Sequence, residues 1–167
     1  MNMHSPANRA PDYEKINAKL NASWTSADYA QIGIRLQITG ESLAEAADFR
    51  PGSRVLDVAA GNGNATLAMA RRWCDVVSTD YVDRFLDSGR RRAEAEGLDV
   101  TFQQADAQNL PFADESFDGV VSTFGVMFAP DQSKAASELI RVCRPGGQIA
   151  LASWTPKSFI GKLCPTI

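Results

Sequence analysis

The sequence predicts an α/β fold in which a parallel sheet carries helices on both faces. From residue 50 onward, short apolar runs alternate with amphipathic stretches of helical spacing. Each apolar run is followed by glycines or acidic residues, where a buried strand would end. Alternation of strand and helix is typical of a parallel sheet, because a helix returns the chain to the same edge. The 167 residues are enough for one domain with a sizeable core.

Four segments follow one another along the chain. We expect a disordered start over 1–12, a helical N-terminal extension that acts as a lid over 13–49, the α/β core over 50–156, and a short tail over 157–167. The helical expectation for the extension rests on four apolar residues at helical spacing, namely Tyr13, Ile16, Leu20 and Trp24. The spacing from Ser42 to Glu45 is that of a capping box, which predicts a break between two helices at that point.

The core is expected to contain five strands, over 55–59, 75–80, 100–104, 118–123 and 148–153. A helix over 65–73 follows the first strand. The next helix follows the second strand, with Asp83 as its N-cap and Gly97 as its C-cap. Asp131 caps the last helix, and the residues expected on its buried face are Ala135, Leu139, Ile140 and Cys143.

Composition indicates a globular protein without a strongly charged partner. Apolar residues make up 44% and charged residues 22%, and the net charge is −3, so we expect neither nucleic acid nor a membrane as partner. The three cysteines are widely spaced, which argues against a disulfide framework or a zinc site, and we expect no bound metal. The start has no signal-peptide pattern, and no apolar run approaches the roughly 20 residues of a membrane span. We therefore predict a cytoplasmic protein.

Ligands of such sheets bind beyond the carboxyl ends of the strands. The first strand is followed by Gly61 and Gly63, which allow a tight turn and close approach of a ligand. An ordinary strand-to-helix turn explains this loop equally well. The second strand ends in Asp80, roughly 20 residues further on, where a carboxylate is suited to accept both hydroxyls of a ribose. Loop and acid together predict a ligand that contains adenosine.

Charge distinguishes between adenosine ligands. Asp57 lies within the first strand, and Asp80 and Asp106 follow the second and third. The nearest basic residues are expected to be Arg71 and Arg72, about two helical turns beyond the loop. Three carboxylates would repel the pyrophosphate of a dinucleotide and attract a sulfonium and an ammonium group. Charge therefore favours S-adenosylmethionine over NAD.

Motifs at five places, in this order, together resemble those of class I S-adenosylmethionine-dependent methyltransferases. Residues 55–63 resemble the first motif, acid-x-G-x-G-x-G, with Ala59 in place of the first glycine. The other matching segments are 77–80, 104–107 with 110–112, 116–122 and 139–147. The resemblance covers about 50–156 and is closest to the small-molecule branch that includes ubiquinone-type methyltransferases. It implies a Rossmann-like sheet in the order 3-2-1-4-5, S-adenosylmethionine as cofactor and a small-molecule methyl acceptor.

The resemblance also implies roles for single residues. Asp57 and the loop over 59–63 would hold the methionine part, with Asp57 acting on its ammonium group. Asp80 would bind the ribose, Asp106 would accept a hydrogen bond from the adenine amine, and the Ala107 backbone would contact the ring. Thr123 and Phe124 would lie near the sulfonium and the transferable methyl group. The residues predicted to bind the cofactor are Asp57, Ala59, Ala60, Gly61, Gly63, Asp80, Tyr81, Asp106, Ala107, Thr123 and Phe124. Ala59 adds one methyl group, which the turn would tolerate if its φ is negative. No residue is identified as a general base, and His4 is the only histidine.

The end of the sequence leads to a further expectation. Methyltransferases of this class continue past the fifth strand with a helix and an antiparallel strand pair, for which residues 157–167 leave no room. We therefore expect the last strands of the usual seven-stranded sheet to be missing, with lowered stability, weak turnover and possible self-association through the exposed edge of the fifth strand.

Two alternative functions stay open. One is a non-catalytic remnant that only binds cofactor. The other is an NAD-binding Rossmann oxidoreductase, which is disfavoured because Thr66 stands where G-x-G-x-x-G requires its third glycine, because the site is acidic, and because the chain lacks a Tyr-x-x-x-Lys pair.

Overall fold

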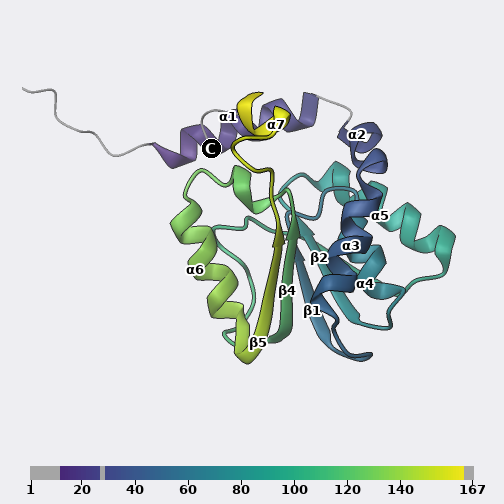
Figure 1. The fold of residues 1–167 in the computed structure, drawn as a ribbon. Coiled ribbons are helices and arrows are strands. Elements are labelled where there is room, and N and C mark those ends of the chain that lie inside the picture. The colour runs from purple at the N-terminus through teal and green to yellow at the C-terminus, as the bar shows by residue number, and fades with distance from the viewer. Residues whose placement is uncertain (1–11, 27–28, 164–167) are drawn as a thin grey trace, which may run out of the picture.

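Five parallel strands form one sheet in the order β3-β2-β1-β4-β5 (Figure 1), in a computed structural model that describes residues 12–26 and 29–163. This order is the one predicted. The strands are β1 (Arg54–Val58), β2 (Asp75–Asp80), β3 (Val100–Gln104), β4 (Phe117–Thr123) and β5 (Cys143–Ala152). The predicted bounds of the second and third strands match those observed. β5 starts earlier than expected, because the chain enters the sheet directly after the preceding helix.

Helices cover both faces of this sheet (Figure 1). The main ones on one face are α3 (Gln37–Ala47), α4 (Asn64–Ala70) and α5 (Asp83–Glu96), and α6 (Gln132–Val142) covers the other. α1 (Tyr13–Ser26), α2 (Tyr29–Arg35), the 3-10 turn η1 (Val126–Phe128) and α7 (Phe159–Leu163) lie toward the carboxyl ends of the strands. One apolar cluster lies between α3, α4 and the sheet, and a second lies on the α6 side. Small residues on α3 and α4, such as Ala44 and Ala68, allow these two helices to pack closely.

Helix ends were predicted with mixed success. Gly97 ends α5 in the left-handed conformation with φ 65°, and the Asp131 side chain caps α6 by accepting from the Lys134 N–H, as expected. The expected break at Ser42 is wrong, because α3 continues through it and the chain bends at Leu36 instead. Asp83 is not an N-cap either, because Val82 occupies the cap position without a side-chain hydrogen bond and Asp83 lies in the first helical turn.

The buried face of α6 lacks two of the expected residues, Ile140 and Cys143, and includes Val142 instead. Ala135, Leu139 and Val142 are buried, whereas Ile140 is 66% exposed. The early start of β5 explains the difference, since Cys143 pairs with Phe117 in the sheet and the helix ends at Val142.

β5 forms one edge of the sheet, and its side chains are only partly covered. Ile149 and Leu151 are 37% and 48% exposed. Self-association along this edge stays a prediction. Across the described ranges, we find no helix with the length and apolar character needed to cross a membrane. The predicted disordered start and the end of the tail, including His4 and Cys164, lie outside the described residues.

The register of the strands determines where their polar ends meet. Val58 at the end of β1 pairs with Thr79 of β2, and Asp80 pairs with Gln104 at the end of β3. The residues that follow β1, β2, β3 and β4 therefore share one edge of the sheet, which is the edge predicted to bind ligand.

Candidate functional site

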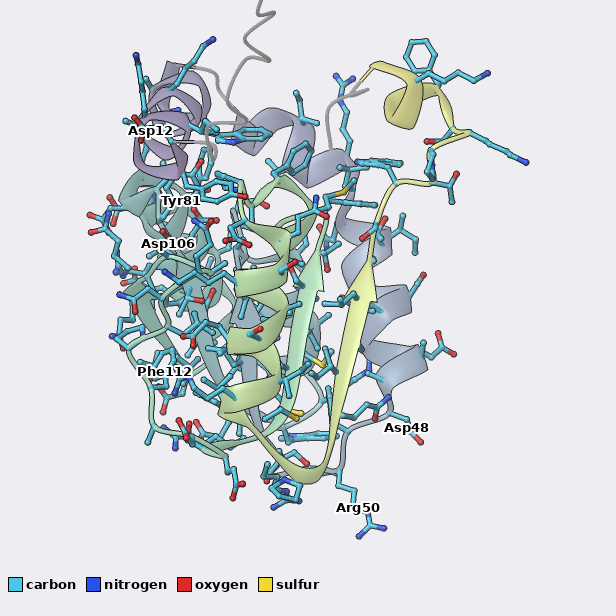
Figure 2. The ribbon with its side chains drawn as sticks, turned by 90° about the vertical axis from the view of Figure 1, so that its left-hand side faces the viewer. Asp12, Asp48, Arg50, Tyr81, Asp106 and Phe112 are labelled. Atoms are coloured by element: carbon cyan, nitrogen blue, oxygen red, sulfur yellow. The ribbon has the colours of Figure 1, made fainter. Side chains whose placement is uncertain are left out.

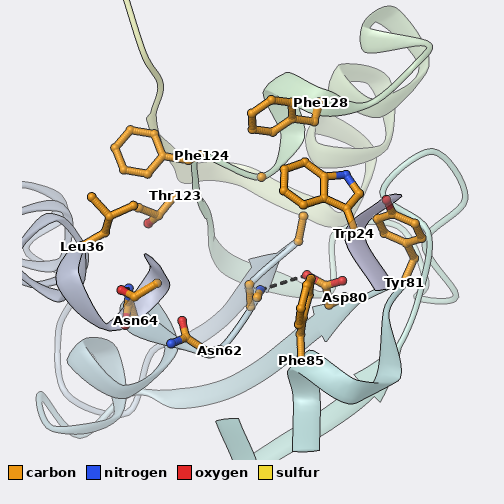
Figure 3. Close-up of a pocket in the computed structure, with 15 residues that line it drawn as sticks. Trp24, Leu36, Asn62, Asn64, Asp80, Tyr81, Phe85, Thr123, Phe124 and Phe128 are labelled. Carbon is orange, nitrogen blue, oxygen red and sulfur yellow. Dashed lines mark hydrogen bonds between the residues drawn. The ribbon is translucent and has the colours of Figure 1, made fainter. Parts of the chain in front are cut away.

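Two adjoining cavities lie at the carboxyl edge of the sheet. The first is lined by Trp24, Gly33, Leu36, Ala59, Ala60, Gly61, Asn62, Asn64, Asp80, Tyr81, Phe85, Thr123, Phe124, Gly125 and Phe128 (Figure 3). The second is lined by Ala59, Tyr81, Ala105, Asp106, Ala107, Gly125, Val126, Phe128, Ala129 and Pro130. Because four residues line both, the two cavities form one cleft. Nine of the residues predicted from the sequence line it, and Asp57 and Gly63 do not.

Asp80 connects the loop after β1 with the start of α5. One carboxylate oxygen accepts from the Gly61 N–H at 2.9 Å (Figure 3). The other accepts from the Val82 N–H at 2.9 Å. The side chain is almost fully buried, and this burial raises its pKa to about 6 despite the hydrogen bonds, which act in the opposite direction. The carboxyl group is thus held in a fixed orientation at the wall of the first cavity.

Asp57 is buried on the α4 side of the sheet, outside the lining of either cavity. Its Oδ2 accepts from the Thr66 hydroxyl at 2.6 Å, and its Oδ1 has no partner among the described residues. Burial raises the pKa of this carboxyl to about 7. The structure therefore does not bring Asp57 together with Asp80 at the cleft, and its predicted contact with an ammonium group stays a prediction.

Asp106 lies in the second cavity, where a residue that the sequence reasoning missed orients it. Gln108 donates its backbone N–H to Asp106 Oδ1 at 2.9 Å, and its side-chain Nε2 lies 3.2 and 3.3 Å from the two carboxylate oxygens. The Gln108 Oε1 accepts from the Asp131 N–H at 2.9 Å, and the side chain is buried. The amide thus fixes the Asp106 carboxylate relative to the start of α6.

Tyr81 lines both cavities and is close enough to both acids for their charges to act on its phenol. Its pKa is raised to about 12, first by burial and then by the negative charges of Asp80 and Asp106. The phenol therefore stays a neutral hydrogen-bonding group. Tyr81 and Asp106 lie at the same end of the molecule, whereas Asp48 and Arg50 lie at the opposite end (Figure 2).

The loop after β1 adopts a left-handed conformation at Ala59, Gly61 and Gly63, with φ of 53°, 58° and 83°. The condition of a negative φ at Ala59 is therefore not met. The reason is that the chain turns sharply at the strand end so that the Ala60 N–H donates to the Thr79 carbonyl at 2.8 Å. A non-glycine residue in this conformation costs about 1–2 kcal/mol.

A basic residue from α5 supports the same loop from behind. Arg92 donates to the backbone carbonyl of Asn62 at 2.7 Å and to Asn64 Oδ1 at 2.9 Å. The expectation that Arg71 and Arg72 are the nearest basic residues is wrong, since Arg92 contacts the loop directly, whereas Arg71 and Arg72 form ion pairs with Glu41 and Glu96. Arg92 does not line either cavity, so the cleft wall itself gains no positive side chain from it.

Aromatic side chains form much of the remaining wall. Phe124 follows β4 with φ 58° and stacks on Trp154 with ring centroids 4.1 Å apart. Trp24 of α1 packs edge-on against Phe128 at 5.2 Å. Thr123 also lines the first cavity, and its buried hydroxyl has no partner among the described residues. Within the described ranges, no group of three or more His, Cys, Asp or Glu residues is placed to hold a metal ion.

Comparisons with known proteins agree with this geometry. Residues 56–151 match a family model described as a methyltransferase domain. An uncharacterized Mycobacterium tuberculosis protein is 46% identical over 159 residues, which are 95% of this chain and 58% of the relative. A demethylmenaquinone methyltransferase of Clavibacter sepedonicus is 40% identical over 62% of this chain and 42% of its own length.

The fold also has counterparts among solved structures. A SAM-dependent methyltransferase from Aquifex aeolicus superposes with a TM-score of 0.67 over 89% of this chain and 76% of its own, at 21% identity, which is a likeness of fold. The chain spans somewhat more than half the length of the Mycobacterium tuberculosis relative.

Proposed function

Since the chain belongs to the class I S-adenosylmethionine-dependent methyltransferases, we propose that its cleft binds S-adenosylmethionine and supports methyl transfer to a small-molecule acceptor. The observation that carries the proposal is that Asp80 lines the first cavity and Asp106 the second, while Tyr81 lines both cavities of one continuous cleft. Adenine then occupies the second cavity, with its amine donating to Asp106 and its ring beside the Ala107 backbone. The ribose hydroxyls donate to Asp80.

Charge supports a cationic ligand. No lysine, arginine or histidine is among the described residues that line the two cavities. The two acids therefore favour the sulfonium and ammonium groups of S-adenosylmethionine over the pyrophosphate of NAD. The aromatic rings of Phe124 and Phe128 add favourable contacts to a cation in the first cavity. Thr123 and Phe124 follow β4, where the transferable methyl group would lie.

Methyl transfer mainly requires that the protein align the methyl donor with the acceptor. The cofactor supplies a methyl group on a sulfonium, which is a strong leaving group. The residues of the cleft would hold donor and acceptor at near-attack distance and exclude water. The aromatic wall suits an apolar acceptor, and a small-molecule acceptor is supported by the relative whose name is demethylmenaquinone methyltransferase. A general base is required only where the acceptor must lose a proton.

We also propose that the helical extension over 13–49 acts as a lid on the cleft. Trp24 of α1 packs on Phe128, and Gly33 and Leu36 line the first cavity. Gly33 further accepts a hydrogen bond from Asn64 Nδ2 at 2.7 Å, which ties α2 to the loop after β1. These contacts would shield the methyl group from water.

Calorimetric titration of the protein with S-adenosylmethionine, S-adenosylhomocysteine and NAD tests the proposal. We expect micromolar binding of both sulfur ligands and none of NAD. Asp80→Ala should weaken binding by about tenfold to a hundredfold, because a hydrogen bond to a charged group contributes roughly 1.5–3 kcal/mol. Asp83→Ala is the matched control, since this acid lies three residues further on with a side chain that is 63% exposed.

The other outcomes point to the alternatives. Binding of both sulfur ligands without turnover on any acceptor would support a cofactor-binding remnant. A folded protein that binds neither sulfur ligand would refute the proposal, and preferential binding of NAD would support an oxidoreductase instead.

A further inference from the structure

Gly33 is the point at which α2 approaches the loop after β1. Among residues 32–35 of this helix only Gly33 is buried, and its neighbours Ile32 and Ile34 are 56% and 58% exposed. A Cβ atom at residue 33 would lie 2.7 Å from Asn62 Oδ1, so the close approach requires glycine at this position. Because this part of α2 buries little apolar surface, its polar contacts determine how firmly it is held.

Asn64 supplies the polar contact that joins the loop to α2. Its side chain is buried, and its Nδ2 donates to the Gly33 carbonyl at 2.7 Å. That carbonyl lies in the last turn of α2, where helix carbonyls have no partner four residues further on and depend on other donors. Gly33, Asn64 and Leu36, which follows α2, all line the first cavity (Figure 3). The hydrogen bond therefore holds the end of α2 against the wall of this cavity.

Arg92 of α5 fixes which end of the Asn64 amide faces α2. Its guanidinium donates to Asn64 Oδ1 at 2.9 Å and to the Asn62 carbonyl at 2.7 Å. A guanidinium can only donate, so the amide must present its oxygen to Arg92 and its NH₂ group to Gly33. Rotating the amide end over end would place two donors together on one side and two acceptors together on the other. Arg92 lines neither cavity and acts on α2 through Asn64.

We propose that Arg92 and Asn64 are positioning residues that hold α2 closed over the first cavity, and that opening of this contact limits how fast the cofactor enters and leaves. We call the two hydrogen bonds, from Arg92 to Asn64 and from Asn64 to Gly33, the α2 latch. The inference rests on the proposed function, because it assumes that S-adenosylmethionine binds in the cleft. Since the latch joins protein groups only, it slows binding and release to the same extent and leaves the affinity nearly unchanged.

Stopped-flow fluorescence with S-adenosylhomocysteine measures both rates, with Trp24 in the cavity wall as the reporter. Asn64→Asp keeps an acceptor for Arg92 but cannot donate to the Gly33 carbonyl. We expect the association and dissociation rate constants both to rise by about threefold to tenfold, as for the loss of one hydrogen bond, and the Kd to stay within about twofold of the wild type.

Two further variants disturb the latch without adding a negative charge. Arg92→Met removes the group that orients the amide and should accelerate both rates in the same way. Arg90→Met is its matched control, because this arginine of the same helix forms ion pairs with acids of α5. Gly33→Ala places a Cβ atom against Asn62 and should also accelerate both rates. Thermal melting verifies that each variant folds.

Hydrogen–deuterium exchange of the ligand-free protein tests the latch independently of any ligand. In Asn64→Asp and Arg92→Met, the amides of α2 should exchange about threefold to tenfold faster than in the wild type. The amides of β1 and β4, in the interior of the sheet, should exchange as in the wild type. Arg90→Met should leave both regions unchanged.

The outcomes separate the latch from the function on which it rests. Wild-type protein that binds no S-adenosylhomocysteine refutes the proposed function and the control of cofactor exchange together. Wild-type protein that binds it, with variants that melt at a lower temperature but keep both rates, shows a purely structural contact and overturns the inference alone. Faster dissociation without faster association also overturns it, since that pattern indicates a lost contact to the ligand. Unchanged hydrogen exchange of α2 in both variants overturns the latch whether or not a ligand binds.

Discussion

Replacing Asp57 with asparagine is expected to flatten the pH dependence of stability. The carboxyl group is buried between β1 and α4, with one oxygen bonded to Thr66 and the other without a described partner. Burial raises its pKa from 3.8 to about 7. The folded state therefore holds this proton more tightly than the unfolded chain, and the free energy of unfolding falls as the pH rises from about 4 to about 7.

The size of the effect follows from the pKa shift. A shift of about three units corresponds to roughly 4 kcal/mol as an upper value, since one unit corresponds to about 1.4 kcal/mol. Between pH 5 and pH 8, ionisation of Asp57 lowers the free energy of unfolding by about 2–3 kcal/mol. An asparagine side chain cannot ionise, so the Asp57→Asn variant should lack that loss. Asp80, whose pKa is raised to about 6, still contributes a smaller slope of the same sign in both proteins.

Urea unfolding of wild type and Asp57→Asn at pH 5, 6, 7 and 8 measures this difference. The two proteins should be of similar stability at pH 5, and the variant should be more stable at pH 8. Parallel pH profiles would refute the raised pKa. The same variant tests the role that family resemblance implies for Asp57, because loss of a contact to the ammonium group should weaken binding of S-adenosylhomocysteine by about tenfold. A change below about threefold would match its position outside the cleft.

Two further substitutions test the walls of the cleft. Gln108→Leu should weaken binding of S-adenosylhomocysteine by about five- to tenfold, because the amide no longer orients Asp106. The preference for adenine over hypoxanthine in matched ligands should fall for the same reason. An unchanged preference in calorimetry would contradict this prediction. Ala59→Gly should raise the free energy of unfolding by about 0.5 kcal/mol, since relief of left-handed strain exceeds the entropy cost of glycine; urea unfolding that shows destabilisation would contradict it.

Much of the fold was predictable because residues typical of strands mark the strands in the sequence. β2 is buried along most of its length and contains Val76, Val77 and Thr79, whereas the edge strand β3 is only partly covered but begins with Val100, Thr101 and Phe102. The start of β5 was not predictable in the same way. Its residues Arg144 to Gly147 are typical of a turn, and they join the strand only because Cys143 pairs with Phe117 at the start of β4.

The acids of the cleft were predictable because they come directly after strands. The positions of Asp80 and Asp106 could be predicted from the rule that parallel strands bring their carboxyl ends to one edge of the sheet. Arg92 and Gln108 could not be found in this way. Arg92 reaches a loop 30 residues earlier in the chain, and Gln108 is buried because it bonds an N–H 23 residues later. Such contacts depend on how α5 and α6 pack, and no local pattern encodes them.

The electrostatics of the cleft explain why its acids are held by neutral donors. An arginine beside Asp80 would lower its pKa and stabilise the free protein, but it would also cancel the charge that attracts a cationic ligand. The chain instead satisfies Asp80 with the N–H groups of Gly61 and Val82, and places Arg92 behind the loop, on the backbone of Asn62. The raised pKa of Asp80 is the cost of this arrangement in the free protein. A ligand that brings a positive charge offsets that cost, and it does so only when bound.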